Sequence, residues 1–231
     1  MHLGTYSDYV PNSYKILTGT LFMKYIFGPV HSRRLGLSLG IDLLPYKTCS
    51  INCVYCECGR TTVLTTDIKE HVPTKEVIKE LKETLHQDPN LDVVTFAGSG
   101  EPTLHSGIGE IISFIKNTYP AYKVAVLTNG TMFWNKTVGN NLKHADIVMP
   151  SLDAIAENSF KKMLRPHKDI TLSKMLDGIR IFSEEFAGSL IIEIFIIPGI
   201  NDSDEELQNF KTYLMSINPT LIQLNSLDRP G

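Results

Sequence analysis

The chain has 231 residues, 42% of them hydrophobic, and carries a formal net charge of −3 at pH 7. This length is enough for one domain with a substantial core, whereas the slightly negative charge excludes a general attraction to nucleic-acid backbones or anionic membranes. No apolar stretch reaches the length of a membrane-spanning helix, so we expect no membrane association.

Residues 1–22 differ in composition from the rest of the chain. They are rich in Tyr, Ser, Asn, Thr and Gly, show no clear periodicity, and lack the charged flank and apolar segment of a signal peptide. We therefore expect an N-terminal extension over 1–22 and one core domain over 23–231. The extension is either a genuine arm or the result of an over-long gene prediction.

Strand-like and helix-like segments alternate from Leu37 onward. Apolar runs rich in Val, Ile and Thr predict six strands, over 37–44, 91–97, 122–128, 145–149, 190–197 and 221–224. Apolar residues at helical spacing predict helices over 74–85, 108–119, 173–185 and 202–216, with Thr74 as the N-cap of the first.

This alternation predicts an α/β fold with a parallel sheet built from right-handed βα units. Six units can form either an open Rossmann-type sheet or an incomplete barrel. A Rossmann site needs G-x-G-x-x-G after the first strand, and this chain has a cysteine-rich loop there instead. The sequence therefore favours the barrel, in which functional side chains gather at the carboxyl ends of the strands.

The most informative motif is the C-x3-C-x2-C run of Cys49, Cys53 and Cys56. Three thiolates at this spacing can hold three irons of a [4Fe–4S] cluster and leave the fourth iron without a protein ligand. Cys58 is the fourth cysteine of the chain, so a closed four-cysteine cluster or a zinc site is the alternative. The clustering argues against a disulfide framework and favours a reducing compartment, and we expect a cytoplasmic protein.

Two further features accompany the cysteines. Tyr55 directly precedes Cys56, and the sequence Gly98-Ser99-Gly100-Glu101-Pro102 follows the second predicted strand. Together these motifs resemble the radical S-adenosylmethionine (SAM) superfamily, over most of the chain from about residue 38. The resemblance implies a partial (β/α)6 TIM-like barrel, a [4Fe–4S] cluster and SAM as cofactors, and Cys49, Cys53 and Cys56 as metal ligands.

The resemblance also implies which residues contact SAM. The open iron would chelate its amino and carboxylate groups, Tyr55 would lie near the adenine, and the turn at 98–102 would receive the ammonium, with Glu101 adding charge. Ser99 stands where the family has Gly. The SAM-binding residues implied in this way are Tyr55, Gly98, Ser99, Gly100, Glu101, Asn129, Ser151, Asp153, Arg165 and Ile197.

Three of these residues have an ordinary structural alternative. Ser151 or Asp153 would bind the ribose, yet both residue types commonly cap helices. Arg165 would form a forked contact with the SAM carboxylate, yet arginines are commonly exposed on the surface.

The segment from Arg33 to Gly36 and the run from Cys56 to Gly59 resemble the group of this superfamily that includes wyosine-synthetase relatives. Glu193 lies inside an apolar strand, and because a buried carboxylate needs a partner we expect it to point into the barrel. The substrate candidates are Arg33, Arg34, Asp42, Glu193, Asn225, Asp228 and Arg229.

The resemblance implies an enzyme that receives one electron from an external donor such as flavodoxin or ferredoxin, cleaves SAM, and abstracts a hydrogen atom from its substrate. Related enzymes modify a guanine of tRNA, but such a substrate calls for a basic face, so we expect a small molecule. The leading candidate is a free deazapurine base of the queuine type, acted on by a lyase in salvage. A tRNA-modifying enzyme, a non-catalytic iron–sulfur electron-transfer module and a radical-generating activator of another protein are the alternatives, and the sequence is compatible with a homo-oligomer.

Overall fold

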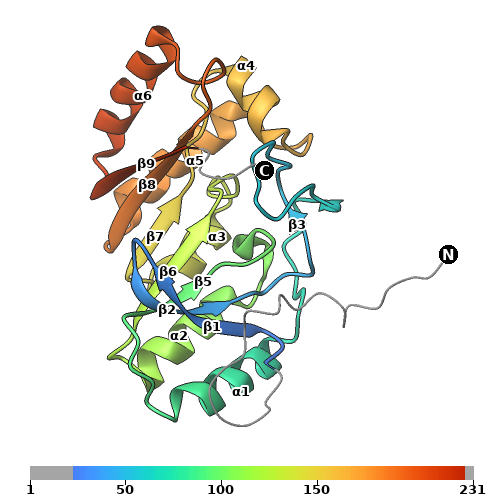
Figure 1. Cartoon of the computed structure of the whole chain (residues 1–231), viewed down its shortest axis with the longest axis vertical. Coiled ribbons are helices and arrows are strands. Elements are labelled where there is room, and N and C mark those ends of the chain that lie inside the picture. Colours follow the sequence, from blue (N-terminus) through green and yellow to red (C-terminus); the bar gives the residue numbers. More distant parts are fainter. Residues whose placement is uncertain (1–22, 227–231) are drawn as a thin grey trace, which may run out of the picture.

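The computed structural model describes residues 23–226, which form a curved seven-stranded sheet with helices packed against it (Figure 1). The strand order is β1-β2-β5-β6-β7-β8-β9, and every neighbouring pair is parallel except β1 and β2. The strands of this sheet are β1 (Ile26–Ser32), β2 (Gly36–Ile41), β5 (Val93–Phe96), β6 (Lys123–Thr128), β7 (Ile147–Pro150), β8 (Ser189–Ile196) and β9 (Leu221–Ser226).

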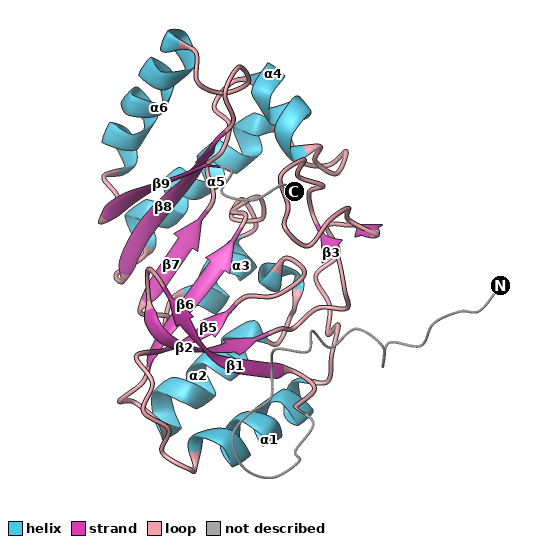
Figure 2. Cartoon of the chain, viewed as in Figure 1, coloured by secondary structure: helices cyan, strands magenta, loops and turns pink. Residues whose placement is uncertain are grey.

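The helices follow the strands and cover the outer face of the curved sheet (Figure 2). The longer ones are α1 (Thr74–Leu85), α2 (Ile108–Thr118), α3 (Lys136–Leu142), α5 (Leu172–Glu185) and α6 (Asp204–Ile217). Three single-turn elements, η2 (Pro102–Leu104), α4 (Glu157–Ser159) and η3 (Phe160–Leu164), and a separate strand pair, β3 (Thr48–Cys49) and β4 (Val63–Leu64), complete the described part. None of the helices in residues 23–226 is long and apolar enough to cross a bilayer.

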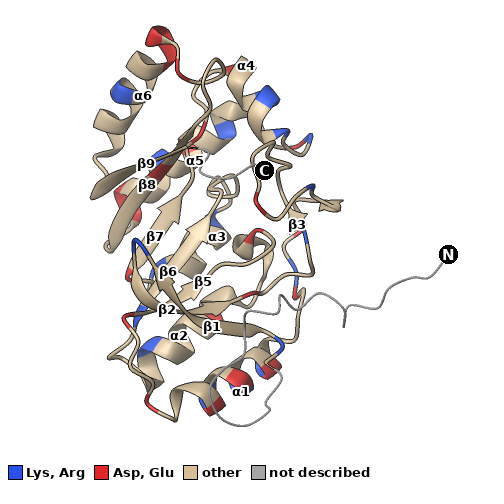
Figure 3. Cartoon of the chain, viewed as in Figure 1, with Lys and Arg blue, Asp and Glu red and all other residues tan. Residues whose placement is uncertain are grey.

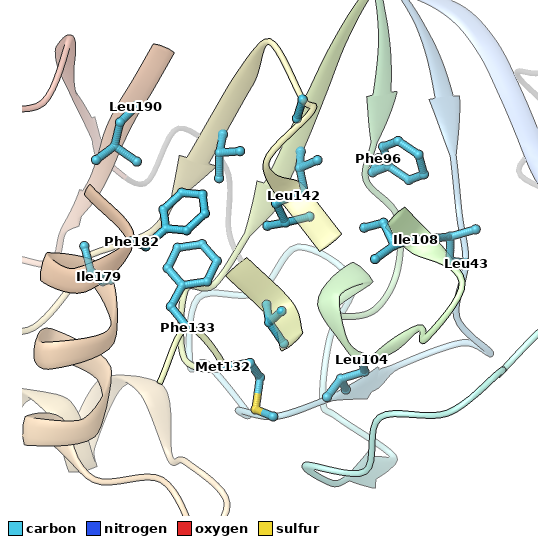
Figure 4. Packing of buried hydrophobic residues seen from close by; sticks show 14 of the residues in the cluster. Leu43, Phe96, Leu104, Ile108, Met132, Phe133, Leu142, Ile179, Phe182 and Leu190 are labelled. Carbon is cyan, nitrogen blue, oxygen red and sulfur yellow. The ribbon is translucent and has the colours of Figure 1, made fainter. Parts of the chain in front are cut away.

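The core fills the layer between the helices and the sheet (Figure 4). Helix α2 contributes Ile108, Ile111, Ile112 and Ile115, all at most 1% exposed, because their spacing places them on one face. Burying one such side chain contributes about 1.5–3 kcal/mol. This layer therefore holds the sheet in the curvature that brings the ends of its strands together.

The predicted α/β fold with six parallel strands in a partial barrel is confirmed. The missed elements are β1, the β3–β4 pair, η2, α3 and the α4–η3 segment. Helix α3 was missed because only Val138 and Leu142 are buried and because Gly139 and the asparagines at 140 and 141 are weak helix formers. Its first turn depends on Asn135, whose side chain accepts a hydrogen bond from the Thr137 amide at 3.0 Å.

The prediction of Thr74 as an N-cap is wrong. Pro73 occupies the N-cap position, and Thr74 is the buried first residue of α1. The carboxylate of Glu70 accepts a hydrogen bond from the Thr74 amide at 2.9 Å, so a side chain four residues earlier satisfies the free amide at this helix start.

The predicted extension over 1–22 lies outside the described residues. The same holds for the substrate candidates Asp228 and Arg229, because the description ends at Ser226.

Candidate active site

The cysteine loop (residues 49–58) begins on β3 and is held by the segment around η3. The Asn52 amide donates to the Leu164 carbonyl at 2.8 Å, and the Val54 amide donates to the Met163 carbonyl at 2.9 Å. On the other side, the His167 amide donates to the Ser50 carbonyl at 3.0 Å. The π-helical turn η3 therefore fixes the loop between its first and third cysteines.

All three predicted ligands are partly buried thiols without a disulfide partner. Burial raises the pKa of Cys49 to about 11 and also raises that of Cys53. Cys56 behaves differently, because hydrogen bonding with Cys58 lowers its pKa to about 5 and Lys47 adds to the shift. Metal ions bind the thiolate form, so binding releases protons at Cys49 and Cys53.

Two side chains outside the cysteine loop contact the ligand sulfurs. The ammonium of Lys47 lies 2.9 Å from Cys56 Sγ, and the Asn129 amide nitrogen lies 3.5 Å from Cys49 Sγ. Donors aimed at cluster sulfurs are among the features that tune iron–sulfur sites. Lys47 was missed from the sequence. Its side chain is only 2% exposed, and such burial is rare for a lysine unless it has a partner.

This donor set fits a [4Fe–4S] cluster. No group of three His, Cys, Asp or Glu side chains within residues 23–226 converges on a point where one metal ion could bind. A cluster distributes its ligands over separate irons, whereas one zinc ion requires them all around a single point. Three cysteine thiolates are the ligands of a [4Fe–4S] cluster with one open iron, whereas a structural zinc ion takes four Cys or His ligands.

Cys58 lies beside these ligands, and its hydrogen bond to Cys56 raises its pKa well above the ordinary value. Its backbone carbonyl accepts a hydrogen bond from the Tyr46 hydroxyl at 2.9 Å. We interpret it as a neighbour of the ligands.

The 98–102 turn packs against two parts of the site, and its glycines make this approach feasible. A Cβ added to Gly98 would lie 2.2 Å from Asp42 Cγ, and one added to Gly100 would lie 2.3 Å from the Thr48 carbonyl oxygen. Ser99 donates both its amide and its hydroxyl to Asp42, each at 3.1 Å. In the structure these glycines serve close packing within the protein, including packing against the strand that carries Cys49.

Glu101 connects this turn to the end of β6. Its buried carboxylate accepts hydrogen bonds from the amide and hydroxyl of Thr103, from the Thr128 hydroxyl and from the Asn129 amide, at 2.6–3.1 Å. Burial raises its pKa. Because all four bonds are made with protein groups, we interpret Glu101 as a residue that positions Asn129, in contrast to the direct contact with SAM expected from the sequence.

Tyr55, Asp153 and Phe195 form a compact unit beside the cysteines. The Tyr55 ring stacks on that of Phe195, with centroids 4.3 Å apart and planes 8° apart. The Tyr55 hydroxyl donates to the Asp153 carboxylate, which also accepts from the Phe195 amide at 2.7 Å. These contacts link the cysteine loop to the ends of β7 and β8.

A buried asparagine supports this unit and was missed from the sequence. The side-chain amide of Asn201 donates to the carbonyls of Asp153 and Phe195 at 2.8 and 2.7 Å, and its oxygen accepts from the Ile197 amide at 2.8 Å. The turn sequence from Pro198 to Asn201 was the only local signal for it. Asn201 thus fixes the backbone around Ile197, which the sequence assigned to SAM.

The remaining predicted residues occupy different positions. Ser151 forms an isolated parallel bridge with Glu193 at the end of β7. Arg165 ends η3 in a left-handed conformation, and its side chain is exposed. Hydrogen bonds bring Arg34 and Asn225 to Glu193. Glu193 lies on β8, the strand that also carries Phe195.

The family model of the radical SAM superfamily matches residues 43–210. The chain belongs to this superfamily. Its members use a [4Fe–4S] cluster and SAM.

Relatives of this radical SAM chain are longer than the chain itself. It is 41% identical over 206 residues to a Brachyspira hyodysenteriae protein named GTPase Obg. The matched region covers 89% of this chain and 30% of that protein. It is 38% identical to a UPF0026 protein of Helicobacter pylori, over 89% of this chain and 67% of the relative. The structure of TYW1 with a lysine-pyruvate adduct bound shares the fold, with a TM-score of 0.59 and 19% identity over 83% of this chain and 65% of that one.

Asp153 is expected to make stability depend on pH. Burial raises its pKa from 3.8 to about 7, so the folded state holds this proton more tightly than the unfolded state. The resulting stabilisation is complete below pH 3.8 and is lost as the pH rises towards 7. Between pH 5 and pH 7, the wild type should lose roughly 2–3 kcal/mol of unfolding free energy relative to Asp153→Asn. Urea unfolding of both proteins across this range tests the prediction, and parallel pH profiles would contradict it.

Proposed function

We propose that this chain binds a [4Fe–4S] cluster through Cys49, Cys53 and Cys56, cleaves SAM reductively, and abstracts a hydrogen atom from a small-molecule substrate. The supporting observation is the way the cysteine loop meets the Tyr55–Asp153–Phe195 unit and the 98–102 turn at the carboxyl ends of neighbouring strands. This is the edge of a parallel barrel at which chemistry is expected.

The bound cofactors would supply one-electron cleavage of SAM to methionine and a 5′-deoxyadenosyl radical. The protein residues would bind and orient SAM beside the cluster. The stacked rings of Tyr55 and Phe195 and the side chain of Ile197 would form an apolar surface for the adenine, and Ser151 or Asp153 would bind the ribose. Asn129, held by Glu101, and the backbone of the 98–102 turn would bind the amino-acid end, and Arg165 is proposed for the carboxylate.

A small molecule remains the favoured substrate class. Lys and Arg are interspersed with Asp and Glu over the described part (Figure 3), and the whole chain has a net charge of −3. A tRNA enzyme is expected to show a basic face for the phosphate backbone. We propose a free deazapurine base of the queuine type, acted on by a lyase, and a flavodoxin or ferredoxin as electron donor.

The experiment compares substrates with the reconstituted holoenzyme. Without oxygen, SAM and dithionite are supplied alone, with queuine, or with bulk tRNA, and 5′-deoxyadenosine is measured, with Cys53→Ala as the control. We expect queuine to raise the rate at least about tenfold over SAM alone. Stimulation by tRNA alone would overturn the small-molecule proposal while preserving the enzyme class, and would identify the tRNA-modifying alternative.

A further inference from the structure

Three acidic side chains are candidates for recognising a polar substrate at this site, and their hydrogen-bond contacts differ. Glu101 is 2% exposed and its carboxylate binds four protein donors. Asp42 accepts from the amide and hydroxyl of Ser99 and from the Leu44 amide. Both carboxylates are therefore engaged in holding the 98–102 turn and the loop before it.

Glu193 differs from both, because it lies on β8 with its side chain 19% exposed. One of its oxygens accepts from Arg34 at 2.5 Å and the other accepts from Asn225. Each carboxylate oxygen has about two lone-pair sites. Within the described residues each oxygen of Glu193 accepts one of these hydrogen bonds, so the group retains capacity for a second pair of N–H donors.

The partners of Glu193 come from opposite ends of the sheet. Arg34 lies in the turn between β1 and β2, whereas Asn225 lies on β9, the last strand in the sheet order. Figure 1 shows the β1–β2 turn extending towards β8 and β9, and Arg34 also donates to Gln223 at 3.4 Å. The cluster of Arg34, Glu193, Gln223 and Asn225 therefore bridges the two ends of the curved sheet on its inner side.

This cluster adjoins the proposed SAM site. Residues two apart on a strand share a face and lie about 7 Å apart, so Glu193 is one such step from Phe195, whose ring stacks on Tyr55. In the register of β8 and β9, Glu193 pairs with Gln223 and Phe195 pairs with Asn225. A planar molecule over this surface could contact the polar cluster while lying next to the cofactor site.

We propose that Glu193, oriented by Arg34 and Asn225, is the specificity determinant that binds the guanine-like edge of a planar heterocyclic substrate. This inference rests on the proposed function. A guanine-like edge presents two adjacent N–H donors beside a carbonyl, and a carboxylate can accept from both donors as it does from a forked guanidinium. Arg34 and Asn225 supply donors for the carbonyl. An adenine-like edge presents a lone pair where guanine has an N–H, and would leave Glu193 facing an acceptor.

The alternative is that the Arg34–Glu193 pair only holds the sheet together. The test uses the cluster-loaded full chain and measures equilibrium binding of queuine, guanine and adenine, together with SAM affinity and the thermal unfolding midpoint. Glu193→Gln keeps the size of the side chain but replaces one acceptor oxygen with a donor. The matched control is Glu184→Gln, which alters an exposed glutamate paired with Arg180 at 2.9 Å on α5.

We expect the wild type to bind queuine or guanine at least about tenfold more tightly than adenine, and Glu193→Gln to lose at least about tenfold in that affinity, with SAM affinity retained. Glu184→Gln should match the wild type in every measurement. The inference is overturned if the wild type does not discriminate against adenine. This comparison does not depend on the folding of any variant. It is also overturned if Glu193→Gln binds queuine as the wild type does, or loses SAM and queuine together. A wild type that cleaves no SAM would instead contradict the proposed function itself.

Discussion

Replacing Cys49, Cys53 or Cys56 by alanine is expected to abolish the cluster, with near-complete loss of bound iron and of sulfur-to-iron charge-transfer absorbance. Each of these thiolates would hold a separate iron. Among residues 23–226, no group of three His, Cys, Asp or Glu side chains offers another metal site. Iron and sulfide analysis of the reconstituted variants, with their absorption spectra, measures the effect. Loss of the cluster should eliminate SAM cleavage as well.

The matched control for this series is Cys58→Ala. Cys58 lies two residues after Cys56 and is hydrogen-bonded to it, so the substitution should retain most of the iron. Equal loss of iron in Cys58→Ala and Cys56→Ala would contradict the assignment of an open iron. It would favour the closed four-cysteine cluster and, with it, the electron-transfer module.

Replacing Glu101 by alanine is expected to reduce both stability and SAM affinity. The variant leaves the amide and hydroxyl of Thr103, the Thr128 hydroxyl and the Asn129 amide without their acceptor. An unsatisfied buried donor costs about 1–3 kcal/mol, so the free energy of unfolding should fall by about 3 kcal/mol or more. Asn129 would lose its position beside Cys49, and we expect SAM affinity to fall at least about tenfold.

Glu101→Gln separates the geometric contribution from the charge. The amide keeps one acceptor oxygen and the shape of the side chain, so we expect an effect on unfolding about half as large as that of alanine. Urea unfolding and calorimetric titration with SAM measure the two quantities. SAM affinity within about twofold of the wild type in both variants would remove Glu101 and its turn from the binding site.

Local sequence patterns predicted the elements whose apolar residues follow regular helix or strand spacing. Helix α1 begins and ends at the predicted residues because its apolar side chains follow one helical face without interruption. The α4–η3 segment was missed although Phe160, Met163 and Leu164 are buried. Its π-helical turn does not follow the regular spacing on which a helix prediction depends.

In the candidate site, too, contiguous motifs were predicted and contacts between distant residues were missed. The spacing of the cysteines and the glycine-containing turn identified the cofactor class, because both motifs are contiguous in sequence. The contacts of Lys47 with Cys56 and of Asn201 with Asp153 depend on tertiary folding, so no local pattern indicated them. Likewise, the sequence indicated that Glu193 needs a partner, but Arg34 lies 159 residues away in the chain.

The activity proposed for this chain is the cleavage of SAM at a cluster held by three cysteines. The most direct measurement supplies the anaerobically reconstituted protein with SAM and dithionite and quantifies 5′-deoxyadenosine and methionine, beside the same protein carrying Cys53→Ala. We expect the wild type to form both products in equal amounts and the variant to form neither. A wild type that contains a full cluster, yet forms no 5′-deoxyadenosine, would contradict it.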